Sequence, residues 1–239
     1  MNVIFLAAGK SSRIYKVLRK PKCLLDFKGI SLIEKLIKNF SFSKKIKLNI
    51  VVGFKSSMIK NKLKRYKNIN FIFNKDYNKK EMLYSMILAL KKINDNAIIS
   101  YSDIWYDKSI CKILIKKKNN IYLPILSNWK KIWKVRKKNM YQDAENLQVD
   151  KKLNLKKIGQ KIKILKKVEY QYMGLIFIPK SKIKKIINVY ESIENKEKMH
   201  LTKFLDKILN FGMKIKCIKY KKDWYEFDDI DDYKNYIKN

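Results

Sequence analysis

Apolar runs of about five residues alternate along this chain with segments in which apolar side chains recur at helical spacing. Short apolar runs rich in β-branched residues are typical of buried strands, and i, i+4 spacing is typical of amphipathic helices. Regular alternation of the two predicts an α/β fold with a largely parallel sheet and helices on both faces. We expect strands at residues 3–7, 48–52, 69–73, 97–101, 121–126, 173–178 and 214–218, and helices at 31–39, 81–92, 107–117, 180–191 and 201–210.

The 239 residues are predicted to form a single domain, 1–239, because no linker or composition break divides them. Residues 127–172 interrupt the alternation, with aromatic and acidic side chains set among polar ones. We expect this segment to be an insertion that covers the substrate.

The net charge of +36 comes from 57 basic and 21 acidic residues. Such a charge would ordinarily suggest nucleic acid or an anionic membrane as the partner. However, the lysines are spread almost evenly, and no recognition module with clustered arginine stands out. No stretch approaches the roughly 20 apolar residues of a membrane span. We therefore expect neither nucleic acid nor membrane insertion, and the charge would speed encounter with a polyanion such as a nucleoside triphosphate.

The three cysteines, Cys23, Cys111 and Cys217, are far apart and include no CxxC pair. They suggest neither a disulfide framework nor a zinc site, and they fit a reducing, cytoplasmic location.

A phosphate-binding loop is predicted where the first strand ends. The apolar run stops at Ala7, Ala8 and Gly9 and is followed by Ser11, Ser12 and Arg13. Small residues let a ligand approach the main chain, while N–H groups, hydroxyls and a guanidinium suit phosphate oxygens. The loop is not a Walker A motif, which needs a glycine before Gly9, and not GxGxxG, because the next glycine is Gly29.

Two groups of acidic residues predict a magnesium site. Asp103 follows the strand at 97–101, and residues 223–232 hold six of the 21 acidic residues. Because Mg²⁺ takes one or two carboxylates together with substrate phosphates, we expect Asp103 and Asp228 as its ligands, with Asp229 as the alternative. Asp231 and Asp232 are expected only to cap the last helix.

Several motifs, in order along nearly the whole chain, resemble those of the nucleotidyltransferases that couple a nucleoside triphosphate to a phosphate-bearing acceptor. They are LAAGKSSR at 6–13, KPKCLLDFKGISLIEKLI at 20–37, NKDY and LYS within 74–85, YSD at 101–103, YQYMGLIFIP at 170–179, LTKFL at 201–205 and WYEFD at 224–228. The segment NWKKIWKVRKKNMYQDAE at 128–145 is similar to the small-acceptor cytidylyltransferases, which handle phosphocholine, aminoethylphosphonate and phosphorylated glutamine. The resemblance implies a Rossmann-like α/β/α sandwich with a mostly parallel mixed sheet, Mg²⁺ as cofactor, CTP as the nucleotide and a small phosphorylated acceptor.

The resemblance also implies roles for individual residues. Arg13 and Lys22 would be catalytic, at the triphosphate and the reacting phosphates, and Asp103 and Asp228 would hold magnesium. The nucleotide would be bound by Leu6, Ala7, Ala8, Gly9, Ser11, Ser12, Arg13, Tyr84 and Ser85. Two positions depart from the family: Ser11 stands where glycine is frequent, and Glu81 stands where asparagine is usual.

Acceptor choice is expected to lie in the insertion. Aromatic rings could stack on a cationic or amino head group while a carboxylate pairs with its charge. The residues predicted for this role are Trp129, Trp133, Tyr141 and Tyr172, with Asp143 or Glu145 as the carboxylate.

The expected reaction is attack of an acceptor phosphate or phosphonate oxygen on the α-phosphorus. A phosphate monoester is already largely dianionic at neutral pH, so no general base is needed, and the single histidine, His200, is expected to cap or pack. Two alternatives stay open: a sugar-1-phosphate nucleotidyltransferase, and a non-catalytic basic module for nucleic acid or membrane. The residues leave the acceptor, the nucleobase and the oligomeric state open, a homodimer included.

Overall fold

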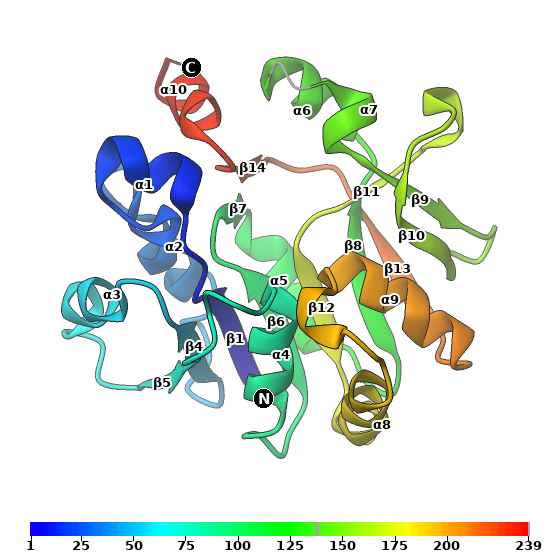
Figure 1. Ribbon diagram of the computed structural model, residues 1–239, viewed down its shortest axis with the longest axis horizontal. Coiled ribbons are helices and arrows are strands. Elements are labelled where there is room, and N and C mark those ends of the chain that lie inside the picture. The colour runs from blue at the N-terminus through cyan, green and yellow to red at the C-terminus, as the bar shows by residue number, and fades with distance from the viewer. Residues whose placement is uncertain (137–138, 239) are drawn as a thin grey trace.

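The computed structural model describes residues 1–136 and 139–238, and strands alternate with helices along it as expected (Figure 1). The strands are β1 (Asn2–Ala7), β2 (Asp26–Phe27), β3 (Ile30–Ser31), β4 (Lys47–Val52), β5 (Ile69–Phe73), β6 (Ala97–Tyr101), β7 (Ile104–Tyr106), β8 (Ile121–Leu126), β9 (Glu145–Val149), β10 (Leu155–Lys161), β11 (Gln171–Tyr172), β12 (Leu175–Ile178), β13 (Ile215–Tyr220) and β14 (Trp224–Glu226). The helices are α1 (Ser12–Leu18), α2 (Leu32–Lys38), α3 (Ser56–Leu63), α4 (Met82–Leu90), α5 (Lys108–Ile115), α6 (Trp129–Arg136), α7 (Met140–Asp143), α8 (Lys180–Glu191), α9 (Leu201–Asn210) and α10 (Ile230–Lys238).

The central sheet runs in the order β11-β8-β12-β6-β1-β4-β5, and β13 also pairs with β8. β6, β1, β4 and β5 are mutually parallel, and β13 is parallel to β8. β12 is antiparallel to β6 and β8, and β11 is antiparallel to β8. The sheet is therefore mixed and mostly parallel, as predicted.

Each face of the sheet is covered by its own layer of helices. Helices α4, α8 and α9 pack on one face through side chains such as Met86, Ile186 and Phe204. Helices α2, α3 and α5 pack on the other through side chains such as Leu36 and Leu114. This arrangement confirms the predicted Rossmann-like sandwich and directs the carboxyl ends of β1 and β6 to one edge of the sheet, where ligands gather in such folds.

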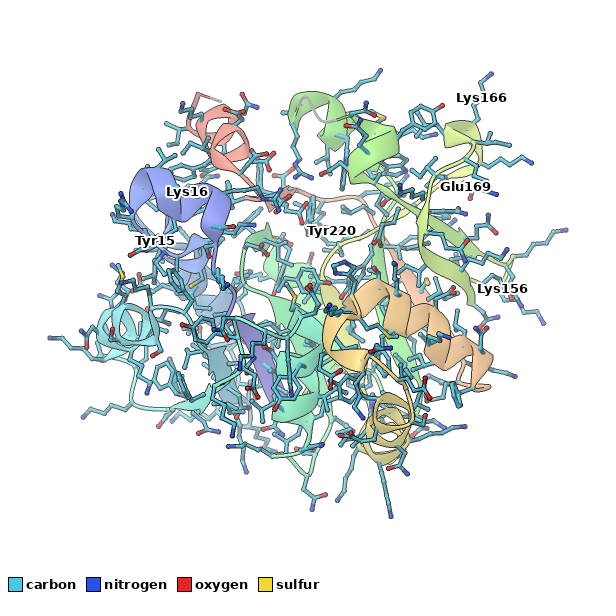
Figure 2. The ribbon with its side chains drawn as sticks, in the orientation of Figure 1. Tyr15, Lys16, Lys156, Lys166, Glu169 and Tyr220 are labelled. Atoms are coloured by element: carbon cyan, nitrogen blue, oxygen red, sulfur yellow. The ribbon has the colours of Figure 1, made fainter. Side chains whose placement is uncertain are left out.

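Residues 127–172 contain α6, α7, β9, β10 and β11, which gather at one side of the molecule (Figure 1). β9 and β10 form a separate antiparallel sheet, while β11 rejoins the central sheet beside β8. Many long basic side chains project outward from the molecule, among them Lys156 and Lys166 in this segment (Figure 2). Among the described residues, no helix combines the length and apolarity needed to span a bilayer.

Helix α2 begins with a capping box that also fastens it to α3. Glu34 Oε2 accepts hydrogen bonds from Ser31 N at 3.0 Å and Ser31 Oγ at 2.6 Å, and Glu34 is also ion-paired with Lys62 and Arg65. Burial alone would raise the pKa of this carboxyl, but the hydrogen bonds from Ser31 and the two cations lower it to about 2. Because the folded pKa lies below the unfolded one, this stabilisation is present above the unfolded value and disappears as pH falls toward the folded value.

We predict that Glu34→Gln lowers the free energy of unfolding by about 2 kcal/mol at neutral pH, through the weakened cap and the lost ion pairs. The difference from the unsubstituted protein should shrink as pH falls from about 5 toward 2, because the native carboxylate then becomes protonated. Urea unfolding over a pH series measures it, with the exposed Glu194→Gln as control. A difference that did not change with pH would contradict the assigned role of the carboxylate.

Candidate active site

A cavity of about 470 Å³ opens where β1 ends, and most of the predicted nucleotide-binding residues line it. It is bordered by the loop after β1, the segment around Lys22, the loop after β5, the start of α4 and the loop after β6. The predicted residues in its wall are Leu6, Ala7, Ala8, Gly9, Ser11, Ser12, Arg13 and Ser85, together with Lys22 and Asp103.

Tyr84 is placed differently. Its ring packs under Lys80, whose Nζ lies 4.1 Å from the ring centroid, and it does not line the cavity. Its neighbour Ser85 does, and Ser85 Oγ accepts a hydrogen bond from Asn74 Nδ2 at 3.0 Å. Asn74, Lys79 and Lys80 also line the cavity and were not predicted.

The loop after β1 is held in a bent conformation at Ser11, whose φ of 54° is left-handed. Such a conformation costs a non-glycine residue about 1 kcal/mol, so it would favour glycine at this position. In return, Ser11 Oγ accepts a hydrogen bond from Lys22 N at 3.1 Å. The departure from glycine therefore ties the phosphate loop to the segment that carries Lys22.

Asp103 and Asp228 are brought together by two short strands that flank them. β7 begins directly after Asp103 and β14 ends two residues before Asp228, and the two strands pair antiparallel with Ile104 opposite Glu226. The main chain continues this pairing, since Phe227 N donates to Asp103 O at 2.9 Å. The backbone thus holds both carboxylates at the same edge as the phosphate loop.

Lys22 lies between the two carboxylates. Its Nζ is 3.2 Å from Asp103 Oδ2 and 2.8 Å from Asp228 Oδ1. Arg13 donates two hydrogen bonds to Asp228, from Nη1 to Oδ2 and from Nη2 to Oδ1, each 2.8 Å long. Burial disfavours the charged forms, but the ion pairs outweigh it, so the pKa of Lys22 is raised and the pKa of Asp228 is lowered. Lys22 and Asp228 are therefore both charged at neutral pH.

The two carboxylates have the chemistry of a magnesium site. Asp103 Oδ1 is buried and has no hydrogen-bond partner among the described residues, which leaves a hard oxygen ligand available. Within residues 1–136 and 139–238, no third His, Cys, Asp or Glu joins them in a metal-binding group. Oxygens of a bound phosphate would therefore have to complete the coordination of the ion.

A second cavity, of about 390 Å³, adjoins the first, and Glu81 and Met82 line both. Its wall is acidic and aromatic: it includes the carboxylates Glu81, Asp143, Glu145, Glu226 and Asp228 and the rings of Tyr101, Trp133, Tyr172 and Trp224. No lysine or arginine of the described chain lines it. In a chain of net charge +36, this cavity is a local reversal of charge.

Two of these carboxylates, Glu145 and Glu226, have raised pKa values. Burial raises the pKa of Glu145, although Thr202 Oγ1 donates a hydrogen bond to its Oε1 at 2.7 Å. Burial, opposed by Arg136 and helped by the charges of Asp103 and Asp228, raises the pKa of Glu226 to about 7. A positive charge placed in this cavity would relieve both.

Four of the predicted acceptor residues line this cavity: Trp133, Asp143, Glu145 and Tyr172. Trp129 does not; it is 1 % exposed and lies in the core, edge-on to Trp133. Tyr141 is 53 % exposed and lies outside the cavity wall. Because Trp129 and Trp133 are four residues apart on α6, both face the protein interior, but only Trp133 reaches the cavity.

Glu226 and Trp224 also line the cavity and were missed, although a local signal for them exists. Trp224, Glu226 and Asp228 alternate with Tyr225 and Phe227, and alternate residues of a strand point to the same face. All three members of the first set line the second cavity. An extended conformation for WYEFD, predicted from the sequence, would have been enough to place Trp224, Glu226 and Asp228 on one face.

The structure corrects the expectation for the acidic tail. The cap of α10 is Asp229, whose Oδ1 accepts hydrogen bonds from the N–H groups of Asp231 and Asp232. Asp232 is 3 % exposed and forms a two-pronged ion pair with Arg136. The prediction that Asp231 and Asp232 serve only as the cap is therefore wrong, because Asp232 forms an ion pair with the buried Arg136 of α6.

His200 precedes α9 but makes no side-chain cap to it. Its ring is 63 % exposed, and Nδ1 lies 3.5 Å from Glu81 Oε2.

An α/β sandwich with a basic phosphate loop and paired carboxylates at the strand ends is the arrangement of a nucleotide-using protein. The model of the MobA-like NTP transferase domain matches residues 3–153, and the chain belongs to this family. It is 28 % identical to the CTP:phosphoglutamine cytidylyltransferase of Campylobacter jejuni, over 97 % of both proteins.

Solved structures of small-acceptor enzymes share the fold. The CTP:phosphocholine cytidylyltransferase from Streptococcus pneumoniae aligns with a TM-score of 0.74 at 17 % identity, covering 98 % of this chain and 96 % of that one. The inositol-1-phosphate CTP transferase from T. maritima aligns with a TM-score of 0.74 at 20 % identity, covering 99 % and 95 %.

Proposed function

We propose that this protein is a cytidylyltransferase that joins CTP to the phosphate or phosphonate monoester of a small amino or quaternary-ammonium compound. The products are a CDP-linked compound and pyrophosphate. The observation that carries the proposal is the acidic, aromatic cavity that adjoins a basic phosphate loop. The Campylobacter relative, whose name gives CTP as the nucleotide, supports the choice of base.

In this proposal the first cavity holds CTP. Leu6 and the small residues Ala7, Ala8 and Gly9 would line the base and ribose close to the main chain, while Ser11, Ser12 and Arg13 would meet the triphosphate. Asp103 and Asp228 would hold Mg²⁺, which when bound supplies Lewis-acid stabilisation of charge on the phosphates.

The acceptor oxygen attacks the α-phosphorus, one P–O bond forms, and the bond to the β-phosphate breaks to release pyrophosphate. Since the acceptor phosphate is already largely dianionic, the protein need not remove a proton. The task of the protein is to bring two anions together, so Lys22 and Arg13 would leave Asp228 for the phosphate oxygens and stabilise their growing charge.

The head group of the acceptor would occupy the second cavity. Asp143, Glu145 and Glu226 would compensate a positive charge, and the rings of Trp133 and Tyr172 would supply cation–π contact. A polyol head group brings no charge to relieve these carboxylates, so we expect it to bind less tightly.

A panel of nucleotides and acceptors tests the proposal through pyrophosphate release. We expect turnover with CTP, and we expect phosphocholine, phosphoethanolamine or aminoethylphosphonate to exceed inositol-1-phosphate and glucose-1-phosphate by about tenfold or more in kcat/KM. Preference for a sugar-1-phosphate with UTP, dTTP or GTP would favour the alternative enzyme. Salt-sensitive binding of RNA or anionic vesicles without any turnover would contradict the proposal.

We place this reaction in the cytoplasm, a proposal supported by the three cysteines, which are all free and buried.

A further inference from the structure

A buried guanidinium joins three segments, two of which, α7 and β14, border the second cavity. Arg136, the last residue of α6, has a side chain that is 7 % exposed. Its Nε and Nη2 bond both oxygens of Asp232, on α10, at 2.9 and 3.0 Å. Its Nη1 lies 2.8 Å from Glu226 Oε2, on β14, and 3.5 Å from Asp143 Oδ2, on α7.

One branch of this network leads to Asp228. The Asp232 side chain is 1 % exposed, and its Oδ2, besides pairing with Arg136, accepts a hydrogen bond from Asp228 N at 3.0 Å. The backbone of Asp228 is therefore fixed to a carboxylate whose own position is set by Arg136. No part of this branch touches the second cavity except Asp228 itself.

The other branch leads to the wall of the second cavity. Glu226 and Asp143 both line that cavity, whereas Arg136 lies behind them. The guanidinium also lies 4.9 Å from the centroid of Trp133, which stacks on Trp224 with 4° between the ring planes. Without a cation behind them, these carboxylates would repel one another and Asp232.

Resting on the function proposed above, we propose that Arg136 is a positioning residue for both substrates. Through Asp232 it sets the position of Asp228, and through Glu226 and Asp143 it sets the carboxylates that face the acceptor. The two branches use different properties of the side chain. The planar fork holds both oxygens of Asp232, which a lysine cannot do, whereas Glu226 and Asp143 require only the positive charge.

The first test measures metal binding and needs no acceptor. Mn²⁺ binding to the full-length protein is followed by electron paramagnetic resonance with a CTP analogue whose α–β bridge is a methylene. We expect Arg136→Gln, Arg136→Lys and Asp232→Asn each to raise the Mn²⁺ dissociation constant about tenfold, because each breaks the fork. The double variant Arg136→Gln with Asp232→Asn should have the same Mn²⁺ dissociation constant as the single variant with the larger one, because both substitutions act along one path. Lys134→Gln, at an exposed position on the same helix, is the control.

The second test separates the branches by acceptor KM, with phosphocholine as the probe. Arg136→Gln should raise this KM about tenfold, while Arg136→Lys, which keeps the charge, and Asp232→Asn should change it less than about threefold. If Arg136 were purely structural, the substitutions would lower the melting temperature but leave the Mn²⁺ affinity and the KM as in Lys134→Gln. That result would overturn the proposal. If Arg136→Gln does not fold, Arg136→Lys and Asp232→Asn still decide it: unchanged Mn²⁺ affinity in both overturns it.

Failure of this inference can be told apart from failure of the proposed function. If the unsubstituted protein turns over no acceptor but the variants weaken Mn²⁺ binding as expected, the role of Arg136 toward Asp228 stands and the substrate assignment falls. If turnover is normal and all variants behave like Lys134→Gln, the function stands and the role of Arg136 falls.

Discussion

Replacing Asp103 with asparagine should lower the rate of pyrophosphate release at least about a hundredfold while leaving the fold intact. The reason is electrostatic. Asp103 supplies one of two carboxylates at the edge of the phosphate loop, and its Oδ1 has no hydrogen-bond partner within the described chain. Asparagine keeps the shape but loses the charge that a magnesium ion needs, a loss of about 3 kcal/mol in transition-state stabilisation.

The matched control for this variant is Asp95→Asn. Asp95 precedes β6 and Asp103 follows it, so the two carboxylates lie at opposite ends of the same strand. Asp95 pairs with the amino terminus and should affect stability alone. If Asp103→Asn melted at the same temperature as the unsubstituted protein and still turned over at a near-normal rate, Asp103 would not belong to the proposed site.

The second large effect is expected for Lys22→Ala, which should lower kcat by a factor of about 10²–10³. Lys22 pairs with both Asp103 and Asp228 in the free protein, and it would move to the reacting phosphates when CTP binds. Its raised pKa keeps it protonated through the ordinary assay range, so the pH dependence of turnover should not report its titration.

Lys22→Ala should also change metal binding, and in the opposite direction to catalysis. With the ammonium gone, Asp103 and Asp228 face each other without it, and a divalent cation no longer has to displace it. Mn²⁺ should therefore bind the nucleotide-free variant more tightly than it binds the unsubstituted protein, even though catalysis is lost. Calorimetry measures this, and the exposed Lys20→Ala is the control. Weaker Mn²⁺ binding in Lys22→Ala would show that the lysine does not compete for the metal carboxylates.

The main elements of the fold could be predicted from the sequence because several strands inside the sheet are buried on both faces. Such strands read as continuous apolar runs, and the predicted bounds of β6 and β8 agree with the structure. Helices α8 and α9 are equally well predicted because each is long enough to repeat its apolar spacing. Helices α1 and α3 were missed because they bury few apolar side chains, only Ile14 in α1 and Ile59 and Leu63 in α3, too few to show a helical spacing.

The site was predicted only in its parts. Residue types and loop composition indicated Asp103 and Asp228, but their convergence depends on the pairing of β7 with β14, two three-residue strands more than a hundred positions apart. No local pattern signals such a pair. The same is true of Arg136, one arginine among many lysines, whose role depends on burial beside Asp232 and Glu226.

The most direct test of the whole account is the position of a divalent ion in crystals grown with CTP and Mn²⁺. The account predicts an anomalous peak within coordinating distance of both Asp103 and Asp228 and of the triphosphate, with Lys22 and Arg13 turned from Asp228 to phosphate oxygens. A peak elsewhere, with Lys22 still joining the two carboxylates beside a bound triphosphate, would contradict it.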